Sequence, residues 1–550
     1  MGAWTACAAI LIAQSSAQEP SATFPVDGVV ENSVTHQPIA RALVEYAQYA
    51  VLTDSEGRFE LHLPTGTAQV SVRRPGFGGG EGSQREAQHS VHMAAKMPPL
   101  TFYLTPSASI TGHVTLSTGD EAEGLQFTLY RKTMVDGHSQ WMQTGNAIAG
   151  SDGVFRLLSL EAPASYALCS SPFPDGTGLT APGATLAGYG GGCYPGGVDL
   201  AAAIAAPLTL SPGQQADVEI NLAKQWFYPV SIAVSNAREN VSFQVFDRDG
   251  PRAGINYRAI GDHAGYEVDL PNGSYYAEAR VWGKQQLYGR VDFTVSGAPV
   301  TGLTLNPSPV QPIAVEIHKE FTISPKGASG LAIDNGINAD NAGIDLSMVP
   351  VDKPLDGPIR MGLRPIEDST GNFRYGFDAP SPGAYQLQVD GYGAYASSIT
   401  SGGTDLLREP LTIGTGKSAA PIEVTLRNDM GGLDCTAKSS PTGTAGDAAG
   451  EAEPSPVFVY AIPRSSGLQR IYRTMAGFGG NQTLGRPFAL PLPPGEYLVV
   501  ASKRDLAIDL DDPDQMSRIA AEGQTVNIQP GATTEVQVDP IDGGKEEANP

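Results

Sequence analysis

Residues 266–275, Tyr-Glu-Val-Asp-Leu-Pro-Asn-Gly-Ser-Tyr, contain the most informative local pattern of this chain. An aromatic residue opens an alternating strand, a Pro/Gly turn follows, and a tyrosine stands near the start of the next strand. Proline presets the φ angle that such a turn needs, and glycine accepts a positive φ. The stretch therefore predicts a β-hairpin whose two strands each bury one face.

The same phrase occurs five times in the 550 residues. Its leading aromatics, separated by 96, 111, 107 and 115 residues, are Phe59, Phe155, Tyr266, Phe373 and Phe488. A period of this length corresponds to one small domain, because a single core rarely serves so long a chain. Strands that bury one face need a second sheet to close a core. The sequence therefore predicts an all-β protein, a tandem array of about five β-sandwich domains.

The predicted boundaries lie where a terminal strand gives way to the next opening strand, as at Leu104-Thr105-Pro106. The predicted sandwiches cover residues 24–105, 106–224, 225–308, 309–427 and 428–541, with a signal peptide at 1–17 and a disordered tail at 542–550. Within the last domain, residues 438–456 are rich in Ser, Thr, Ala, Gly and Glu and predict a flexible loop.

The charge of the chain argues against a polyanionic partner. Its 58 acidic and 35 basic residues give a formal net charge of −23, and the acids are spread over the whole length. Nucleic-acid binding needs a basic face that displaces counterions from phosphates, and the sequence contains no basic stripe. Nucleic acid and anionic membrane surfaces are therefore not expected partners.

The amino terminus predicts export. An apolar run from Ala3 to Ala13 precedes Ser15 and Ala17, small residues that fit the −3 and −1 positions of a signal-peptidase site. The run has no preceding Lys or Arg, so a buried N-terminal helix is the alternative. No later stretch approaches the ~20 apolar residues of a membrane helix. The mature chain is expected to have no membrane-spanning segment and to be secreted, at the cell surface or periplasmic.

Three cysteines lie outside the predicted signal peptide. Cys169 and Cys193 fall in one predicted domain, and a disulfide between them is plausible in an oxidising compartment. Cys435 would then be unpaired, and a small buried hydrophobic side chain is its expected role.

The first predicted domain resembles a known family. It contains Val26-Asp27-Gly28-Val29-Val30, residues 38–44 (Pro-Ile-Ala-Arg-Ala-Leu-Val), residues 53–59 (Thr-Asp-Ser-Glu-Gly-Arg-Phe), and Gly66 with Pro75-Gly76-Phe77. This pattern resembles the carboxypeptidase regulatory-like (transthyretin-like) family, and residues 150–155 and 493–497 retain part of it. The resemblance implies a prealbumin- or Ig-like Greek-key sandwich, sometimes described as a carbohydrate-binding-like fold, that accompanies catalytic or transport domains without catalysing a reaction.

Gly-rich strings further along the chain, such as residues 188–196, resemble long exported multi-repeat proteins of soil bacteria such as Acidobacteria. Because they lack the Lys-Ser/Thr pair that phosphate binding requires, these strings are interpreted as loops.

The catalytic and metal-binding motifs that we sought are missing from the sequence. It has no His-Glu-x-x-His and no Gly-x-Ser-x-Gly, so neither a zinc protease nor an α/β-hydrolase is supported. His89 and His92 have an i, i+3 spacing but no third ligand nearby, which favours an exposed loop. Two acidic clusters, at 334–345 and 509–514, could hold calcium, although turn-forming Asp and Asn explain the first equally well. We therefore predict no enzyme, no metal and no cofactor.

One strand face in the third domain suggests a ligand. Alternation predicts that Tyr276, Arg280 and Trp282 share an outward face, with Tyr288 beside them on the following strand. Aromatic side chains among charges could stack on a sugar ring, but a contact with the neighbouring domain explains the same pattern. The leading prediction is a binding module for polysaccharide or for an envelope protein. The alternative is a structural spacer or adhesive stalk without a small-molecule ligand.

Overall fold

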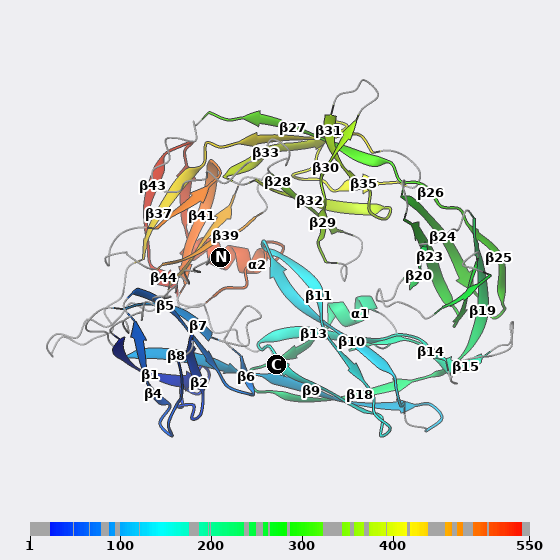
Figure 1. The fold of residues 1–550 in the computed structure, drawn as a ribbon, viewed down its shortest axis with the longest axis horizontal. Helices are drawn as coiled ribbons and strands as arrows, with labels where there is room; N and C mark the ends of the chain where they lie inside the picture. The colour runs from blue at the N-terminus through cyan, green and yellow to red at the C-terminus, as the bar shows by residue number, and fades with distance from the viewer. Residues whose placement is uncertain are drawn as a thin grey trace, which may run out of the picture. The chain divides into compact units, whose positions relative to one another are not determined.

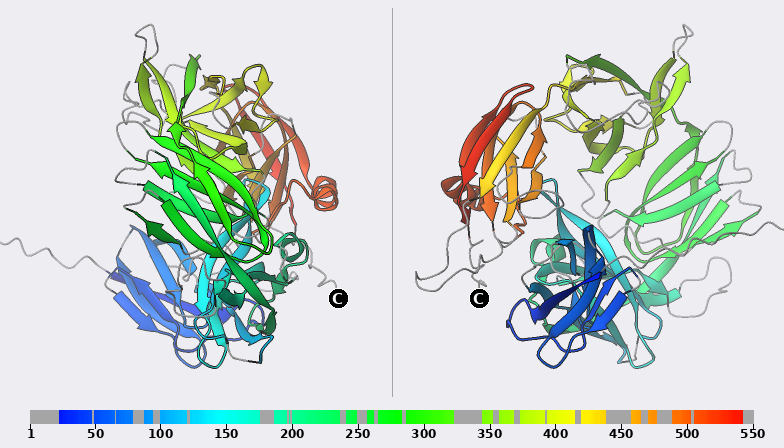
Figure 2. Two further views of the ribbon diagram at one scale, coloured as in Figure 1. Left: turned by 90° about the vertical axis from the view of Figure 1, so that its right-hand side faces the viewer. Right: turned by 60° about the vertical axis from the view of Figure 1, so that its left-hand side comes forward.

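The computed structural model (Figures 1 and 2) describes residues 23–47, 49–64, 66–78, 87–93, 99–119, 122–174, 186–195, 197, 200–235, 241–248, 257–261, 265–282, 286–322, 344–351, 357–367, 373–391, 393–414, 419–437, 457–464, 470–476, 488–502 and 505–541. These residues form many strands and two helices, α1 (Leu200–Ala205) and α2 (Pro513–Glu522). The chain divides into two compact units, and the second begins at Pro106. The predicted fold class, an all-β tandem array of sandwiches, is confirmed.

The first unit contains one sandwich of two four-stranded sheets, with the strand orders β4-β1-β8-β6 and β3-β2-β5-β7. Apolar side chains from both sheets form its core, among them Val30 and Phe102 from the first sheet and Val72 from the second. The strands are β1 (Thr23–Asn32), β2 (Leu43–Tyr46), β3 (Tyr49–Leu52), β4 (Arg58–Pro64), β5 (Gly66–Arg73), β6 (Phe77–Gly78), β7 (Ala87–Met93) and β8 (Leu100–Pro106).

Within the second unit, four large hydrophobic cores follow one another along the chain, formed from residues 108–222, 230–305, 313–426 and 433–538. We call the corresponding domains the second to fifth sandwiches.

The second sandwich contains β9 (Ala108–Leu116), β10 (Gln126–Val135), β11 (His138–Ile148), β12 (Val154–Leu160), β13 (Ala164–Ser170), β16 (Gly192–Tyr194), β17 (Leu208–Leu210) and β18 (Gln215–Leu222). The sheets of the third contain β14 (Phe173–Pro174), β15 (Leu186–Tyr189), β19 (Lys224–Val234), β20 (Val241–Asp247), β21 (Arg258–Ile260), β22 (Gly265–Leu270), β23 (Gly273–Val281), β24 (Leu287–Val295), β25 (Val300–Leu305) and β26 (Ser308–Pro309).

The fourth sandwich contains β27 (Pro312–Glu320), β28 (Ile344–Pro350), β29 (Ile359–Met361), β30 (Arg364–Glu367), β31 (Phe373–Asp378), β32 (Gly383–Gly391), β33 (Ala394–Ser401), β34 (Thr404–Asp405), β35 (Leu411–Ile413) and β36 (Ile422–Arg427). The fifth contains β37 (Gly431–Ala437), β38 (Val457–Pro463), β39 (Tyr472–Ala476), β40 (Phe488–Leu492), β41 (Gly495–Ser502), β42 (Gln524–Ile528), β43 (Thr533–Val538) and β44 (Pro540–Ile541).

All five sandwiches share one arrangement around their opening strand. That strand pairs antiparallel with the first strand of the recurring phrase and parallel with the closing strand of the same sandwich. In the first sandwich, for example, β1 pairs antiparallel with β4 and parallel with β8. The equivalent trios are β9 with β12 and β18, β19 with β22 and β25, β27 with β31 and β36, and β37 with β40 and β43.

The recurring phrase is a corner between sheets, so the predicted hairpin is wrong. In the first, second, third and fifth sandwiches its two strands belong to different sheets, as β22 and β23 do. In the fourth, β31 and β32 belong to one continuous ten-stranded sheet without pairing with each other. Both strands alternate as a hairpin would, because each buries one face in the same core from opposite sides. Alternation alone cannot separate these two arrangements.

Four of the five corners are fastened by the tyrosine that follows the turn. Each tyrosine is buried, and its hydroxyl donates to a backbone carbonyl four or five residues earlier, which is the arrangement called a tyrosine corner. The pairs are Tyr166 to Glu161 (2.7 Å), Tyr275 to Pro271 (3.0 Å), Tyr385 to Ser381 (2.5 Å) and Tyr497 to Pro493 (2.8 Å). Burial raises the pKa of Tyr166 to about 12, so this hydroxyl keeps its proton at neutral pH.

The first sandwich has a different device before its corner. Asp54 Oδ1 accepts the backbone N–H groups of Glu56 and Arg58, both at 2.8 Å, and closes a turn in which Gly57 has a φ of +71°. The next residue in the pattern, Phe59, lies opposite Gly28 on β1. A Cβ at Gly28 would stand 2.3 Å from the Phe59 ring, so glycine makes room for that ring.

Candidate functional site

The predicted ligand face is the outer face of the sheet β20-β23-β24-β26 in the third sandwich. Arg280 lies directly opposite Tyr288 in the pairing of β23 with β24, and the Arg280 guanidinium lies 5.0 Å from the centre of the Tyr288 ring. The structure thus brings these two side chains together. Tyr276, which was predicted to face outward, is only 6% exposed, whereas Trp282 is 54% exposed.

A residue of the fourth sandwich is bonded to this face. Ser381, in the turn between β31 and β32, donates its hydroxyl to Glu278 Oε2 at 3.2 Å and accepts from Arg280 Nη2 at 3.3 Å. Tyr288 donates its hydroxyl to the other Glu278 oxygen at 2.9 Å. Glu278 and Ser381 are 5% and 6% exposed. Burial of a carboxylate without hydrogen-bond partners costs free energy, and these hydrogen bonds offset that cost for Glu278.

The same turn of the fourth sandwich also belongs to its tyrosine corner. The Ser381 carbonyl accepts the Tyr385 hydroxyl, while the Ser381 side chain bonds to the third sandwich. One residue therefore connects the internal corner of the fourth sandwich to the outer face of the third.

A second polar layer covers Tyr276. The Arg290 guanidinium lies 3.9 Å from the centre of the Tyr276 ring, and Arg290 and Arg248 each donate to Asp292 Oδ1 at 2.8 Å. The hydrogen bond from Arg290, together with the charges of both arginines, lowers the pKa of Asp292 below its usual value. Phe246, paired with Tyr276 across the strands, packs against it with ring centroids 5.1 Å apart. Tyr276 is thus a packing residue of this face.

Glu278 and Ser381 were missed as partners by the sequence reasoning. Alternation also puts Glu278 on the outward face, between Tyr276 and Arg280, but its separation of 103 residues from Ser381 gives no sign of the contact. The signal that could have indicated it is Glu278 itself, a carboxylate on a face rich in tyrosine and arginine.

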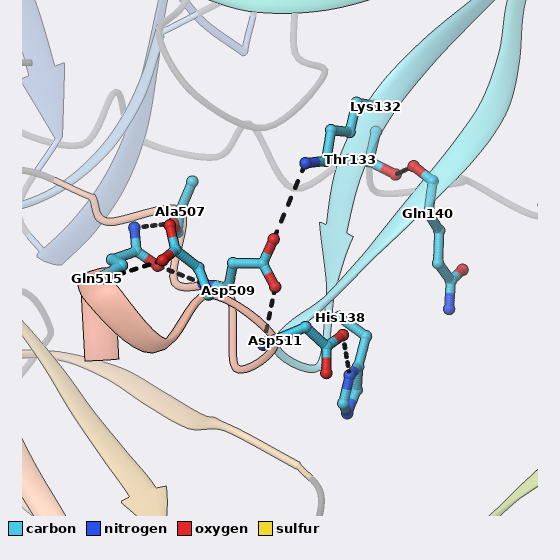
Figure 3. A network of polar contacts seen from close by, with 9 residues as sticks. Lys132, Thr133, His138, Gln140, Ala507, Asp509, Asp511 and Gln515 are labelled. Atoms are coloured by element: carbon cyan, nitrogen blue, oxygen red, sulfur yellow. Dashed lines mark hydrogen bonds and ion pairs between the residues drawn. The ribbon is translucent and has the colours of Figure 1, made fainter. Parts of the chain in front are cut away.

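A second junction joins the hairpin β10–β11 of the second sandwich to the fifth (Figure 3). The hairpin turn consists of Asp136 and Gly137, which have positive φ values of 52° and 88°, as a two-residue turn of this kind requires. The Gly137 carbonyl accepts the Leu510 N–H at 2.7 Å. A Cβ at Gly137 would stand 2.7 Å from side-chain atoms of Ile471 and Leu510, so the turn packs closely on the fifth sandwich.

Charged groups surround this contact. Lys132 Nζ lies 3.9 Å from Asp509, and His138 Nδ1 lies 3.0 Å from Asp511, as Figure 3 shows. Arg470 forms ion pairs with Asp136 and with Asp390 of the fourth sandwich. Burial raises the pKa of Asp136, and Arg470 acts in the opposite direction.

The acidic cluster at 509–514, considered above for calcium, has local structural partners. Asp512 is the N-cap of α2, and its carboxylate accepts the N–H groups of Asp514 and Gln515, both at 3.0 Å. Asp509 Oδ1 accepts the Asp511 N–H at 3.0 Å. Within the described residues, no group of three or more His, Cys, Asp or Glu side chains could hold a metal ion. The side chains of His89 and His92 and residues 334–341 lie outside what the structure describes.

The cysteines lie in two environments. Cys169 on β13 and Cys193 on β16 form a disulfide, with Cα atoms 4.1 Å apart on directly paired residues. Cys435 is free and buried in the core of the fifth sandwich, and burial raises the pKa of its thiol to about 11. The predicted signal peptide and tail lie outside the described residues. No described helix has both the length and the apolar character needed to cross a membrane.

No family model and no curated protein matches the sequence. Among solved structures, the TIE protein of Bacillus anthracis is similar at 10% identity, with 75% of this chain and 76% of that chain covered and a TM-score of 0.16. A streptococcal ancillary pilin matches at 13% identity over 52% of this chain and 100% of its own, with a TM-score of 0.17. The minor pilin GBS52 of Streptococcus agalactiae matches at 11% identity over 37% and 98%, with a TM-score of 0.18. Values this low carry no argument about function.

Proposed function

We propose that this chain is a non-catalytic, exported structural protein in which β-sandwiches serve as a spacer or adhesive stalk. The observation that supports this most strongly is the bond between the corner of the fourth sandwich and the outer face of the third. Glu278 is buried there with Tyr288 and Ser381 as hydrogen-bond partners. A strand face covered in this way is suited to hold two domains at one orientation, and it leaves little room for a ligand.

Export belongs to the proposal for two reasons. The apolar run at Ala3–Ala13, with small residues after it, has the pattern of a signal peptide. The disulfide between Cys169 and Cys193 is a bond that persists in oxidising compartments. Membership of the carboxypeptidase regulatory-like family, which the sequence of the first sandwich suggests, is part of the same proposal because members of that family serve as accessory domains.

The test compares Ser381→Ala with Trp282→Ala in the full chain. Removal of the Ser381 hydroxyl leaves one oxygen of the buried Glu278 without that donor, which should cost about 1–3 kcal/mol at the junction. Hydrogen exchange of the amides in β23 and β24, and limited proteolysis between the third and fourth sandwiches, should both accelerate. Trp282→Ala should change neither. If Ser381→Ala leaves both measurements unchanged, the junction does not hold the domains and the spacer proposal loses its main support.

Carbohydrate binding is the second candidate, because Trp282 remains 54% exposed at the end of β23, two residues from Arg280. An exposed indole beside an arginine could stack on a sugar ring of a polysaccharide, and an envelope protein could use the same surface. A glycan array with the full chain tests this candidate. Binding that Trp282→Ala abolishes would favour it over the spacer, and binding to no glycan would exclude it at this position.

A further inference from the structure

A part of the second sandwich completes a sheet of the third. Strands β14 and β15 lie in sequence between Cys169 and Cys193, both of which belong to the second sandwich. Yet β15 pairs antiparallel with β19, the opening strand of the third, and β14 pairs with β15. The Gly-rich string at residues 188–196 was interpreted as a loop, and that interpretation is wrong for residues 188–189, which end β15, and for residues 192–194, which form β16.

Glycines explain why this string forms strands. A Cβ at Gly188 would lie 2.6 Å from the Phe173 carbonyl oxygen and 2.7 Å from the ring of Phe227 on β19. A Cβ at Gly190 would lie 2.6 Å from the side chain of Gln225. Only glycine lets β14, β15 and the start of β19 approach this closely, so the composition of the string serves close strand packing.

The disulfide is located where these strands leave and rejoin the second sandwich. Cys169 and Cys193 are 2% and 3% exposed, and they pack in a small cluster with Tyr130, Trp141 and the helix α1. This cluster is distinct from the main core of the second sandwich. The sulfur bridge is thus shielded from solvent, which favours a permanent fastening over a reversible switch.

We propose that β14 and β15 form a strap that fixes the third sandwich to the second, and that the Cys169–Cys193 disulfide anchors this strap. The disulfide holds both ends of the segment that contains β14 and β15 at the second sandwich. The strap can therefore leave β19 only if the pairing of β15 with β19 breaks. The pairing extends the sheet across the domain boundary, and a shared sheet resists bending more than a single linking peptide does. This inference goes beyond the spacer function, since a ligand-binding array would be fixed at this boundary in the same way.

The strand β19 provides its own internal reference for a test. Its residues 224–227 pair with β15, whereas residues 228–233 pair with β22 inside the third sandwich. Loss of the strap should therefore affect the amides of residues 225–227 and spare the second set, and Lys224 is left out because its N–H donates to Ser117 Oγ at 2.9 Å. Hydrogen exchange measured on the full chain resolves the two sets.

Two variants remove the strap by independent routes. Cys169→Ser/Cys193→Ser cuts the anchor, and Gly188→Ala obstructs the strand packing while the disulfide stays intact. The matched control is Gly414→Ala, at a glycine with no heavy atom within 4 Å of the added Cβ. We expect exchange at residues 225–227 to rise at least tenfold in both strap variants, with residues 228–233 and the control unchanged.

The two variants also separate the strap from a general role in folding. If residues 225–227 keep their protection in both variants, β15 does not hold β19 and the proposal is overturned. If residues 225–233 all accelerate equally in Gly188→Ala, β15 is an integral part of the third sandwich and not a strap, which also overturns the proposal. Should the cysteine variant unfold the second sandwich, seen as faster exchange throughout β10 and β13, the Gly188→Ala result decides alone.

Discussion

The first and the third sandwiches make the same crossing between sheets with different residues. In the first, Asp54 closes a tight turn before the crossing, and the ring of Phe59 fills the space that Gly28 leaves open. In the third, Tyr275 fastens the crossing through its hydroxyl bond to the Pro271 carbonyl. The first sandwich has Ala68 where the others have this tyrosine. The second sandwich has a tyrosine corner together with a phenylalanine that lies opposite a glycine, as in the first.

This difference explains how far the family resemblance extends. The residues that carry it in the first sandwich, the Asp-x-x-Gly-x-Phe turn and the glycine opposite its phenylalanine, form one local device. The second sandwich keeps the positive φ of Gly153 and the pairing of Phe155 with Gly112, but Gly150 stands at the position of Asp54, and Asp152 Oδ1 accepts the Val154 N–H instead. The fourth has the same Asp-x-x-Gly-x-Phe spacing at Asp368, Gly371 and Phe373, although residues 368–372 lie outside those that the structure describes, and the third and fifth have the tyrosine corner without this spacing in their sequences. A shared fold therefore persists after the local sequence signal has changed.

The largest expected effect tests the space at Gly28. In Gly28→Val the new side chain would meet the Phe59 ring and the Leu100 carbonyl oxygen, 2.6 Å from the added Cβ. Overpacking of this kind should destabilise the first sandwich by about 3 kcal/mol. Hydrogen exchange of the first-sandwich amides under mild urea checks this. The control is Gly78→Val, where no atom lies within 4 Å, and equal effects of the two variants would contradict the account.

The next effect tests the tyrosine corner. Tyr275→Phe keeps the buried ring and removes the hydroxyl that bonds to Pro271, which should cost the third sandwich about 1–2 kcal/mol. The measurement is urea-dependent exchange of the β22 and β23 amides. Tyr257→Phe, at a tyrosine that is 44% exposed, should have no measurable effect. If Tyr275→Phe is as stable as Tyr257→Phe, the buried ring of residue 275 stabilises the corner without any contribution from the hydroxyl.

A smaller effect is expected at the turn of the first sandwich. Asp54→Ala removes an acceptor for two backbone N–H groups at an exposed position, and we expect a loss of about 1 kcal/mol. Asp54→Asn retains a side-chain oxygen and should recover most of the stability. If alanine and asparagine behave alike in the same exchange experiment, the carboxylate oxygen does not hold the turn.

The smallest expected effect is on the stability of the third sandwich at acid pH. The pKa of Asp292 is lowered in the folded third sandwich, so its pairing with Arg290 and Arg248 contributes stability above the unfolded value of 3.8. That contribution is lost as the pH falls through the lower folded pKa. Acid titration of β24 exchange should show a loss of protection in this window, and Asp292→Asn should remove this step. If the acid-dependent loss of protection persists in Asp292→Asn, a group other than Asp292 causes it.

Much of the fold was predictable because it depends on local patterns. The recurring aromatic and Pro/Gly phrase indicated the repeats, and the alternation that puts Tyr276 and Arg280 on one face puts Tyr275, Ala277 and Ala279 on the other, where they are at most 1% exposed. The same pattern could not show that the phrase crosses between sheets, because a hairpin and a corner bury the same alternate residues. Strand partners depend on tertiary pairing, which alternation does not encode.

The candidate site was predictable only in part. Alternation placed Tyr276, Arg280 and Trp282 on one face and Tyr288 beside them, and all four extend from β23, its end or β24. What covers this face depends on Ser381, which belongs to another domain. The strap was missed for a related reason, since glycine favours loops except where two backbones approach closely, as at Gly188.

Oxidative labelling of aromatic side chains in the full chain measures whether the outer face of the third sandwich is covered by neighbouring side chains and by the fourth sandwich. We expect rapid labelling of Trp282 and strong protection of Tyr276 and Tyr288, with Ser381→Ala increasing the labelling of Tyr288. Labelling of Tyr276 and Tyr288 as fast as that of an exposed tyrosine such as Tyr257 would contradict this expectation, because the face would then be open to a ligand.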